Sequence, residues 1–188
     1  MKRSSKLSVA ENVNRTLRKI ARDMGGGQVQ IGFLADGPLS TYPDGTPVAA
    51  AAFWDEFGHG GKFPSPPRPY FRTMIAQESP GWPAKMAALA KLTHFNGAAV
   101  LKLMGEDIAG ALQQSIANYN DIPLAESTLI LRKKFWNNRD QITQADVAEA
   151  IRAAARGEQG ATGAQAKPLV WSGQMLRAVS YEVKGASA

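Results

Sequence analysis

Cysteine is absent from this chain of 188 residues, and histidine occurs only twice. Without cysteine there is no disulfide framework and no thiolate metal site, and synthesis in a reducing compartment is expected. The two imidazoles, of His59 and His94, do not have the sequence spacing of metal ligands. We therefore expect no metal centre, and no motif indicates a bound cofactor.

Long apolar runs are also missing. The longest, residues 48–54 and 98–101, are far shorter than the roughly 20 apolar residues that span a bilayer. The first residues carry charge but lack the apolar core of about 7 or more residues that a signal peptide needs. We expect a soluble chain that has no membrane partner and no export signal.

Charge of one sign is in excess. Lysine and arginine number 22 against 16 acidic residues, which gives a formal net charge of +6. Such a surplus permits contact with nucleic acid or with an acidic protein surface, although an ordinary solvated basic surface is the more common cause. With 44% hydrophobic residues, the chain is long enough to bury one core, so residues 1–188 are expected to form a single domain.

Apolar residues at helical spacing predict two long amphipathic helices. The first begins at Ser8, where Ser8 and Glu11 fit a capping box, and it ends at the glycines 25–27. The second is expected to be the main core helix. Its apolar stripe comprises Val100, Met104, Ile108, Ala111, Leu112 and Ile116.

Proline and a second capping box organise the remaining helical segments. Short helices are expected at residues 48–57, 70–77 and 84–92. Pro80 and Pro83 should kink or split the region between the last two, because proline has no backbone N–H to donate. Thr143 and Asp146 fit a capping box for a helix that reaches residue 155, whereas residues 127–136 have an ambiguous pattern.

Alternation of apolar and polar residues predicts two half-buried strands. The apolar positions are Val29, Ile31 and Phe33 in the first strand and Val179, Tyr181 and Val183 in the second. Because both patterns are one-sided, we expect the N-terminal and C-terminal strands to pair and to present one apolar face to the two long helices. The expected fold class is α+β, with a small antiparallel sheet packed on two or more long helices and with extended proline-rich loops.

Three segments are expected to lack regular structure. Residues 35–47 are rich in proline and glycine and predict a long loop. Residues 64–69 contain four prolines, which enforce an extended path. The stretch near 157–167 is rich in glycine, alanine and glutamine and predicts a flexible excursion.

Few side chains could carry catalysis. Asp55 and His59 could meet at i, i+4 on a helix, with Glu56 beside them, but a capping or interface role explains these residues better. Ser172 and Gly173 lack the leading glycine of a nucleophile elbow, and Ser172 is better explained as a helix cap. We therefore expect a protein that is not an enzyme.

Basic and aromatic residues are clustered at residues 132–139. The cluster comprises Arg132, Lys133, Lys134, Phe135, Trp136 and Arg139. Such a mixture can bind a nucleic-acid strand, but no nucleic-acid motif is present. A helix face whose aromatic residues anchor it to a core or to a neighbouring subunit explains the same residues, and we favour it.

Four segments in a fixed order resemble one protein family. They are 29–33 (VQIGF), 48–59 (VAAAAFWDEFGH), 66–72 (PPRPYFR) and 168–183 (PLVWSGQMLRAVSYEV). Together they are similar to the neck or tail-completion proteins of long-tailed bacteriophages, also called virion morphogenesis proteins. Residues 122–128 (IPLAEST) also resemble a segment of that family, whereas the stretch 136–165 is longer than the family pattern.

The resemblance implies a structural role in the virion, at the neck where head and tail join. Copies of the chain would form a homo-oligomeric ring around the DNA channel, a hexamer being expected, after synthesis in the host cytoplasm. The partners would be a head-completion or stopper protein on one side and a tail terminator or tail tube protein on the other. Two alternatives stay open: a tail terminator or minor tail protein, and a basic DNA-binding accessory protein.

Two sets of residues are expected to make contacts in such a ring. The prolines of 64–69 are explained either by a rigid connector or by an arm that docks on an adjacent subunit. Because arginine and aromatic residues supply interface hot spots, the expected subunit interface comprises Glu56, Phe57, Arg68, Tyr70 and Phe71. The residues expected on the channel wall, in non-specific contact with packaged DNA, are Arg132, Lys133 and Lys134.

Overall fold

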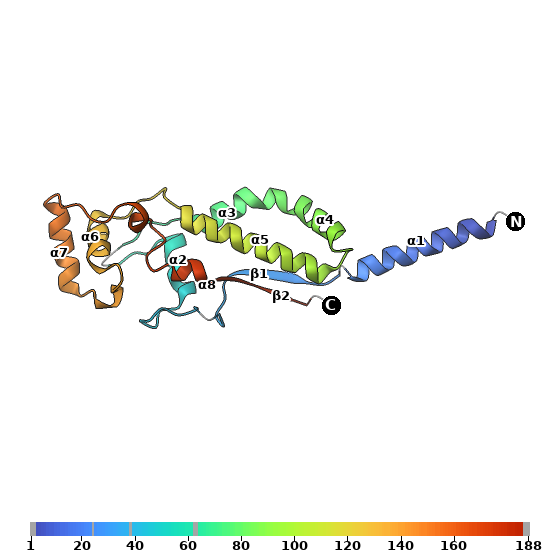
Figure 1. Ribbon diagram of the computed structural model, residues 1–188, viewed down its shortest axis with the longest axis horizontal. Helices are drawn as coiled ribbons and strands as arrows, with labels where there is room; N and C mark the ends of the chain where they lie inside the picture. The colour runs from blue at the N-terminus through green and yellow to red at the C-terminus, as the bar shows by residue number, and fades with distance from the viewer. Residues whose placement is uncertain (1–2, 24, 38, 62–63, 186–188) are drawn as a thin grey trace. The chain divides into compact units, whose positions relative to one another are not determined.

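The computed structural model describes residues 3–23, 25–37, 39–61 and 64–185 and has the expected α+β class (Figure 1). In chain order the elements are α1 (Arg3–Asp23), β1 (Gln28–Phe33), α2 (Val48–Phe57), α3 (Tyr70–Glu78), η1 (Ser79–Gly81), α4 (Trp82–Leu92), α5 (Gly97–Asn118), α6 (Glu126–Phe135), η2 (Arg139–Gln141), α7 (Gln144–Ala155), η3 (Gly163–Ala166), α8 (Gln174–Ala178) and β2 (Val179–Lys184). The η elements are short 3-10 helices.

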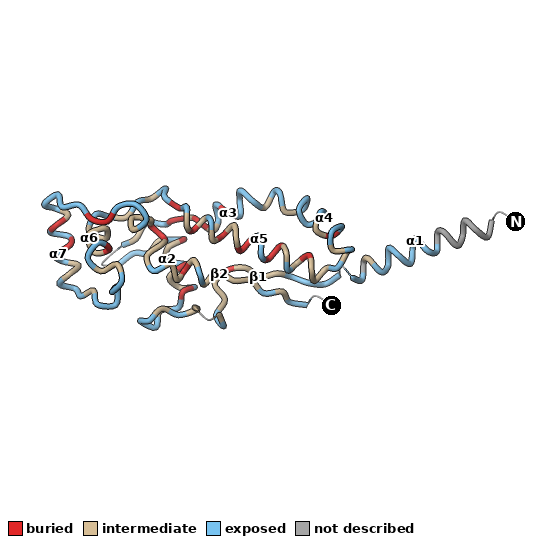
Figure 2. Tube along the Cα trace, in the orientation of Figure 1, coloured by how far each residue is buried: buried red, intermediate tan, exposed pale blue. Residues whose placement is uncertain are grey.

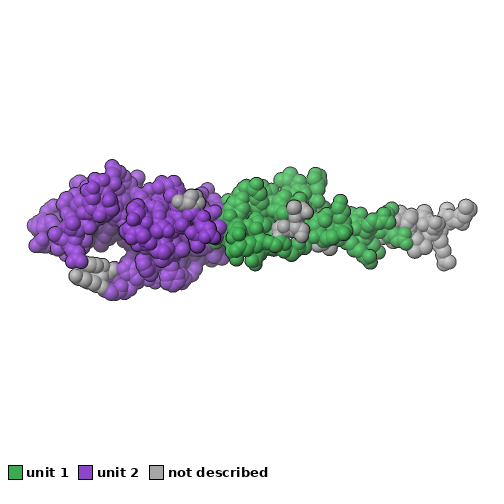
Figure 3. Space-filling model, turned by 90° about the horizontal axis from the view of Figure 1, so that it is seen from below, with its two compact units in different colours: residues 1–31, 78–108, 181–188 green, residues 32–77, 109–180 purple. Residues whose placement is uncertain are grey.

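The chain divides into two compact units (Figure 3). One comprises residues 1–31, 78–108 and 181–188, and the other comprises residues 32–77 and 109–180. Three elements, β1, α5 and β2, contribute residues to both units, so this division does not decide whether residues 1–188 fold as one domain. The expected single domain stays a prediction.

Helix α1 differs from the prediction in its start and in its packing. It begins at Arg3, so Ser8 lies inside the helix and the predicted capping box is wrong. The residues before Ser8 continue the helix because they include neither glycine nor proline. Val13 and Leu17 of the apolar stripe are 51% and 56% exposed, so these two positions are not buried against the sheet as predicted, and residues 9, 21 and 24 of the stripe lie outside the described side chains.

The two strands pair as predicted, in a two-stranded antiparallel sheet. Tyr181 of β2 lies against Gly105 of α5, and its ring occupies the space that a Cβ atom at Gly105 would need. The Tyr181 hydroxyl donates a hydrogen bond to Glu106 Oε1 at 3.0 Å. Helix α5 therefore covers the sheet at this position, and the absence of a side chain at Gly105 allows the close approach.

Helix α5 is the main core helix, as predicted. Buried positions recur along α5 (Figure 2). Five residues of its stripe are at most 6% exposed, namely Val100, Met104, Ile108, Leu112 and Ile116. Burial of each such side chain contributes roughly 1.5–3 kcal/mol. Before α5, Pro80 and Pro83 split the helical region into α3, η1 and α4, as their missing N–H groups predict.

Helices α6 and α7 pack against each other. The ambiguous segment 127–136 lies mostly in α6. The predicted capping box at the start of α7 is confirmed: Thr143 Oγ1 accepts from the Asp146 N–H at 3.2 Å, and Asp146 Oδ2 accepts from the Thr143 N–H at 3.1 Å. These bonds satisfy backbone donors that the first turn of a helix leaves unpaired.

The segment near 157–167 is not the excursion that its composition suggests. The Ala161 N–H donates to the Leu129 carbonyl of α6 at 2.9 Å, and Ala161 is only 4% exposed. The Gly160 N–H donates to Glu126 Oε1 at 2.6 Å, and Gly160 touches the backbone of Leu129 so closely that no Cβ fits. The small residues here permit close packing on α6. From composition alone, the same residues predict a flexible segment.

The proline-rich segments behave as predicted where they are described. An isolated bridge joins Thr41 to Pro47 in the loop 35–47, of which residue 38 lies outside the described residues. Gly58, with a φ of 74°, ends α2, and a second bridge joins His59 to Ser65. From Ser65 the chain runs without helix to the start of α3.

Candidate functional site

Glu56 closes the junction between α2 and α3. Its carboxylate accepts hydrogen bonds from the backbone N–H groups of Phe71 at 2.9 Å and Arg72 at 3.1 Å, which lie in the first turn of α3. It also accepts from Arg72 Nε at 2.8 Å. With only 4% exposure, Glu56 is an internal helix cap, so its predicted place in a subunit interface is wrong.

Tyr70 is also buried within its own chain, whereas Phe71 is only partly buried. Tyr70 is 1% exposed, and its hydroxyl donates to the Ala52 carbonyl at 3.2 Å. Its predicted docking on a neighbouring subunit is wrong, because the side chain is a core residue of its own chain. Phe71 is half-buried, and its ring lies 3.9 Å from the position of a Cβ atom built at Gly32.

Arg68 is also drawn inward. It is 5% exposed, and its backbone N–H donates to the Asp55 carbonyl at 2.7 Å. Its side-chain Nη1 donates to Ser65 Oγ at 2.8 Å and lies 3.9 Å from Asp55 Oδ1. The proline-rich segment therefore binds back onto α2, so Arg68 does not project from the surface as the docking arm that the sequence suggests.

Arg132 holds the turn that precedes α8. Its Nη1 donates to the carbonyls of Gln165, Lys167 and Val170 at 3.0, 2.6 and 3.1 Å, and its Nη2 donates to the Pro168 carbonyl at 3.1 Å. Arg132 is 4% exposed, so its predicted place on a DNA channel wall is wrong. A guanidinium suits this position because it presents several N–H groups in a planar array.

The two neighbouring lysines point elsewhere. Lys133 is exposed, and its Nζ donates to the Gln159 carbonyl at 3.4 Å. Lys134 Nζ lies 2.8 Å from Asp146 Oδ1, with its side chain 63% exposed. Their predicted contact with DNA stays a prediction.

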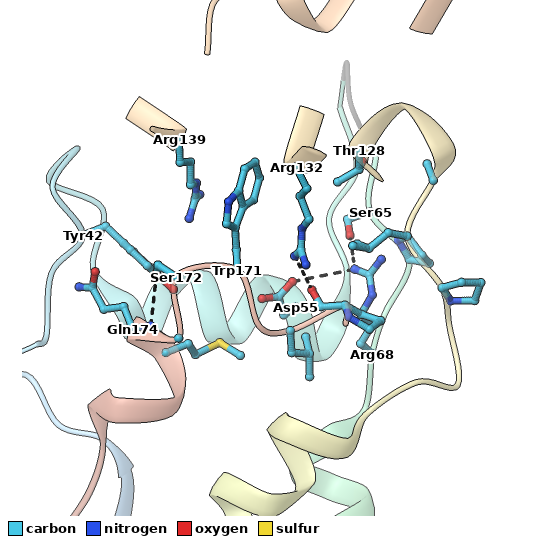
Figure 4. Close-up of a pocket in the computed structure, with 18 of the residues that line it drawn as sticks. Tyr42, Asp55, Ser65, Arg68, Thr128, Arg132, Arg139, Trp171, Ser172 and Gln174 are labelled. Carbon is cyan, nitrogen blue, oxygen red and sulfur yellow. Dashed lines mark hydrogen bonds and ion pairs between the residues drawn. The ribbon is translucent and has the colours of Figure 1, made fainter. Parts of the chain in front are cut away.

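Three arginines, Arg68, Arg132 and Arg139, meet at one cavity in the unit of residues 32–77 and 109–180 (Figure 4). The cavity has a volume of about 470 Å³, and Asp55 is the one acidic residue among the described residues that line it. We call it the arginine pocket. Its lining comes from the loop 35–47, α2, the proline-rich segment, α6, η2 and the turn before α8.

Aromatic rings complete the arginine pocket. The Arg139 guanidinium carbon lies 5.2 Å from the ring centre of Tyr42 and 5.5 Å from that of Trp171. The Arg132 guanidinium carbon lies 5.1 Å from the Trp171 ring, whose Nε1 donates to the Trp136 carbonyl at 3.2 Å. Cations over aromatic faces gain about 0.5–2 kcal/mol, so the rings help to hold the like charges together.

Burial and charge shift the acidity of the groups in the arginine pocket. Burial raises the pKa of Asp55, and the charge of Arg68 opposes that rise. Burial, and next the charge of Arg139, lower the pKa of Arg132 to about 10. Arg132 therefore stays protonated at neutral pH, and it lines the pocket together with Arg68, Arg139 and Asp55.

A second feature of the same unit is an exposed aromatic surface on α2, formed by Phe53, Trp54 and Phe57. These side chains are 58%, 46% and 49% exposed. The rings of Phe53 and Phe57 lie 4.7 Å apart, and the Arg72 guanidinium carbon lies 4.6 Å from the Phe57 ring. We call this surface the α2 aromatic face; of the predicted interface residues, Phe57 belongs to it.

The residues considered for catalysis are not arranged as a catalytic group. His59 Nδ1 lies 3.1 Å from the Gly60 carbonyl oxygen, and among the described residues no hydrogen bond joins His59 to Asp55. Ser172 Oγ accepts from the Gln174 N–H at 3.2 Å. The N-cap residue of α8 is Gly173, one position after the cap that was predicted at Ser172. Within the described ranges, no three histidine or acidic side chains lie close enough together to hold a metal ion.

No protein-family model, curated protein or solved structure matches this chain. Among the described residues, no helix has the length and apolar character that crossing a bilayer requires.

Proposed function

We propose that this chain is a structural protein of the bacteriophage neck, where copies of it form a ring that completes the tail and joins it to the head-completion proteins. The α2 aromatic face carries this proposal. Three large aromatic side chains within five residues, each about half exposed, are costly to leave in water and are typical of a protein–protein interface.

The position of this face in the chain agrees with the sequence resemblance. Phe53, Trp54 and Phe57 lie within the segment 48–59, one of the four that resemble neck proteins. Glu56 and Gly58 of that segment have internal roles, as a helix cap and a helix end. The three aromatic residues of the segment have no such internal role among the described residues, so a second copy of the chain is the partner that we propose for them.

Native mass spectrometry of the purified full chain tests this proposal. We expect a discrete closed oligomer for the natural sequence and a monomer for a Phe53→Ala, Phe57→Ala double variant, because the double variant removes the centre of the interface. Leu92→Ala on α4 is the matched control, since Leu92 is 72% exposed and lies outside the α2 aromatic face. A natural chain that stays monomeric at every concentration, or a double variant that assembles normally, would contradict the proposal.

A further inference from the structure

The arginine pocket carries more positive charge than its own residues compensate. Among the residues that line it, Arg68, Arg132 and Arg139 face the single carboxylate of Asp55. The nearest ion pair, Arg68 Nη1 to Asp55 Oδ1, is 3.9 Å long, beyond hydrogen-bonding distance. Buried guanidinium groups normally have both a counter-charge and hydrogen-bond acceptors, because their desolvation is costly.

Arg132 and Arg68 differ in how far their donors are used. Arg132 gives its Nη groups to four backbone carbonyls. Arg68 gives one side-chain hydrogen bond, to Ser65, among the described residues. The Nε atoms of Arg68 and of Arg132 are both buried without an acceptor in the described chain, so the two residues differ only in the use of their Nη groups. Arg68 lines the pocket, and its Nη groups make one hydrogen bond among the described residues, against four for Arg132.

We propose that the arginine pocket, lined by Arg68, Arg132 and Arg139 (Figure 4), binds a carboxylate of another polypeptide chain, from an aspartate or glutamate side chain. A carboxylate accepts two parallel hydrogen bonds from one guanidinium and adds the negative charge that Asp55 alone does not supply. The aromatic rings of Tyr42 and Trp171 hold Arg139 at the rim of the pocket.

Two observations favour a carboxylate on a peptide over a phosphate. Asp55 lies in the pocket and would repel a phosphate dianion more strongly than a carboxylate monoanion. The other wall residues include Pro64, Pro66, Leu124 and Met175, whose apolar surfaces suit the methylene groups of an acidic side chain. The pocket also lies apart from the exposed rings of the α2 aromatic face, so this proposal does not depend on the neck role.

The test is a titration of the isotope-labelled, purified full chain with N-acetyl-L-glutamate, followed by nuclear magnetic resonance. We expect saturable shifts of the backbone amides of residues 171–175, which line the pocket. N-acetyl-L-glutamine, which has the same shape without the charge, should give no saturable shift. Inorganic phosphate should bind more weakly than N-acetyl-L-glutamate.

Arg139→Gln is the informative variant, because Arg139 is exposed and its loss should leave the fold intact. We expect the affinity for N-acetyl-L-glutamate to fall about fivefold or more, as for the loss of one charge-assisted contact. Arg152→Gln is the control, since the Arg152 side chain is 66% exposed and does not line the pocket. The proposal is overturned by the absence of saturable shifts, by an equal response to N-acetyl-L-glutamine, by tighter binding of phosphate, or by an unchanged affinity of Arg139→Gln.

Discussion

Single buried polar side chains organise the unit of residues 32–77 and 109–180. Arg132 binds the carbonyls of the turn before α8, and Glu56 binds the N–H groups at the start of α3. In both cases one charged side chain satisfies backbone groups far away in the sequence. The cost of burying each charge is offset by several hydrogen bonds to that charge, which are roughly twice as strong as neutral ones.

Arg132→Lys should destabilise the protein by about 2–4 kcal/mol. An ammonium group keeps the charge but lacks the planar fork, so some of the four carbonyls would lose their buried donor. Urea unfolding at neutral pH measures the change. Lys133→Ala, at the adjacent exposed position, should change the free energy of unfolding by less than about 0.5 kcal/mol. Equal effects of the two substitutions would contradict this account of Arg132.

Asp146 should make stability depend on pH in the acid range. Hydrogen bonds from Lys134 and then from Thr143 lower the pKa of Asp146 from 3.8 to about 2 in the folded chain. Because the folded-state pKa is below the unfolded one, this contribution is present above about pH 4 and is lost as the pH falls toward 2. The stability difference between the natural chain and Asp146→Asn, from urea unfolding, should therefore shrink over that interval. A difference that is constant with pH would contradict the assignment.

The burial of Arg132 and Glu56 could not be predicted from the sequence. Arg132 stands next to two lysines that are exposed, and nothing in their order distinguishes the three. What distinguishes Arg132 is the turn 165–170, which lies 33 or more residues away and binds it only in the folded chain. Glu56 is similar, since its partners are 15 and 16 residues further on. The capping box of Thr143 and Asp146 was predictable because its two residues are only three positions apart in the sequence.

At the scale of elements, the two interior glycines of α5 have opposite roles. A Cβ atom at Gly105 would collide with the Tyr181 ring, whereas one at Gly110 would meet no atom within 4 Å. Gly105→Ala should therefore cost about 1–3 kcal/mol through overpacking. Gly110→Ala should stabilise the protein by about 0.5–1 kcal/mol, because alanine loses less conformational entropy in a helix. Thermal unfolding of both variants tests this pair, and the same sign for both would contradict it.

The sequence predicts the burial of an element whose apolar face packs within the same chain, but it does not predict that the apolar face of α1 stays exposed. The stripe of α5 and the alternation of β1 and β2 predict their burial, because each pattern repeats with the period of its own backbone. The stripe of α1 has the same helical period, yet Val13 and Leu17 stay exposed. A hydrophobic pattern reports that a face can be buried, and it does not report which chain covers it.

At the scale of the whole molecule, the proposed role requires that some residues stabilise the fold of the chain while others stay free to bind other chains. Tyr70 and Glu56 serve the fold of their own chain, so the contact between copies is assigned to the α2 aromatic face. The arginine pocket is proposed as a separate contact of different chemistry, for a carboxylate of another chain. Such a division would give a neck protein one apolar surface for its own copies and one charged pocket for a different partner.

Gold labelling of phage particles with an antibody against this chain, viewed by electron microscopy, tests the central claim most directly. The phage used should be one whose genome encodes the chain. The account predicts label at the junction of head and tail, and particles grown without the chain should separate into heads and unjoined tails. Label on the capsid faces or the tail tip, or complete particles that contain none of the chain, would contradict it.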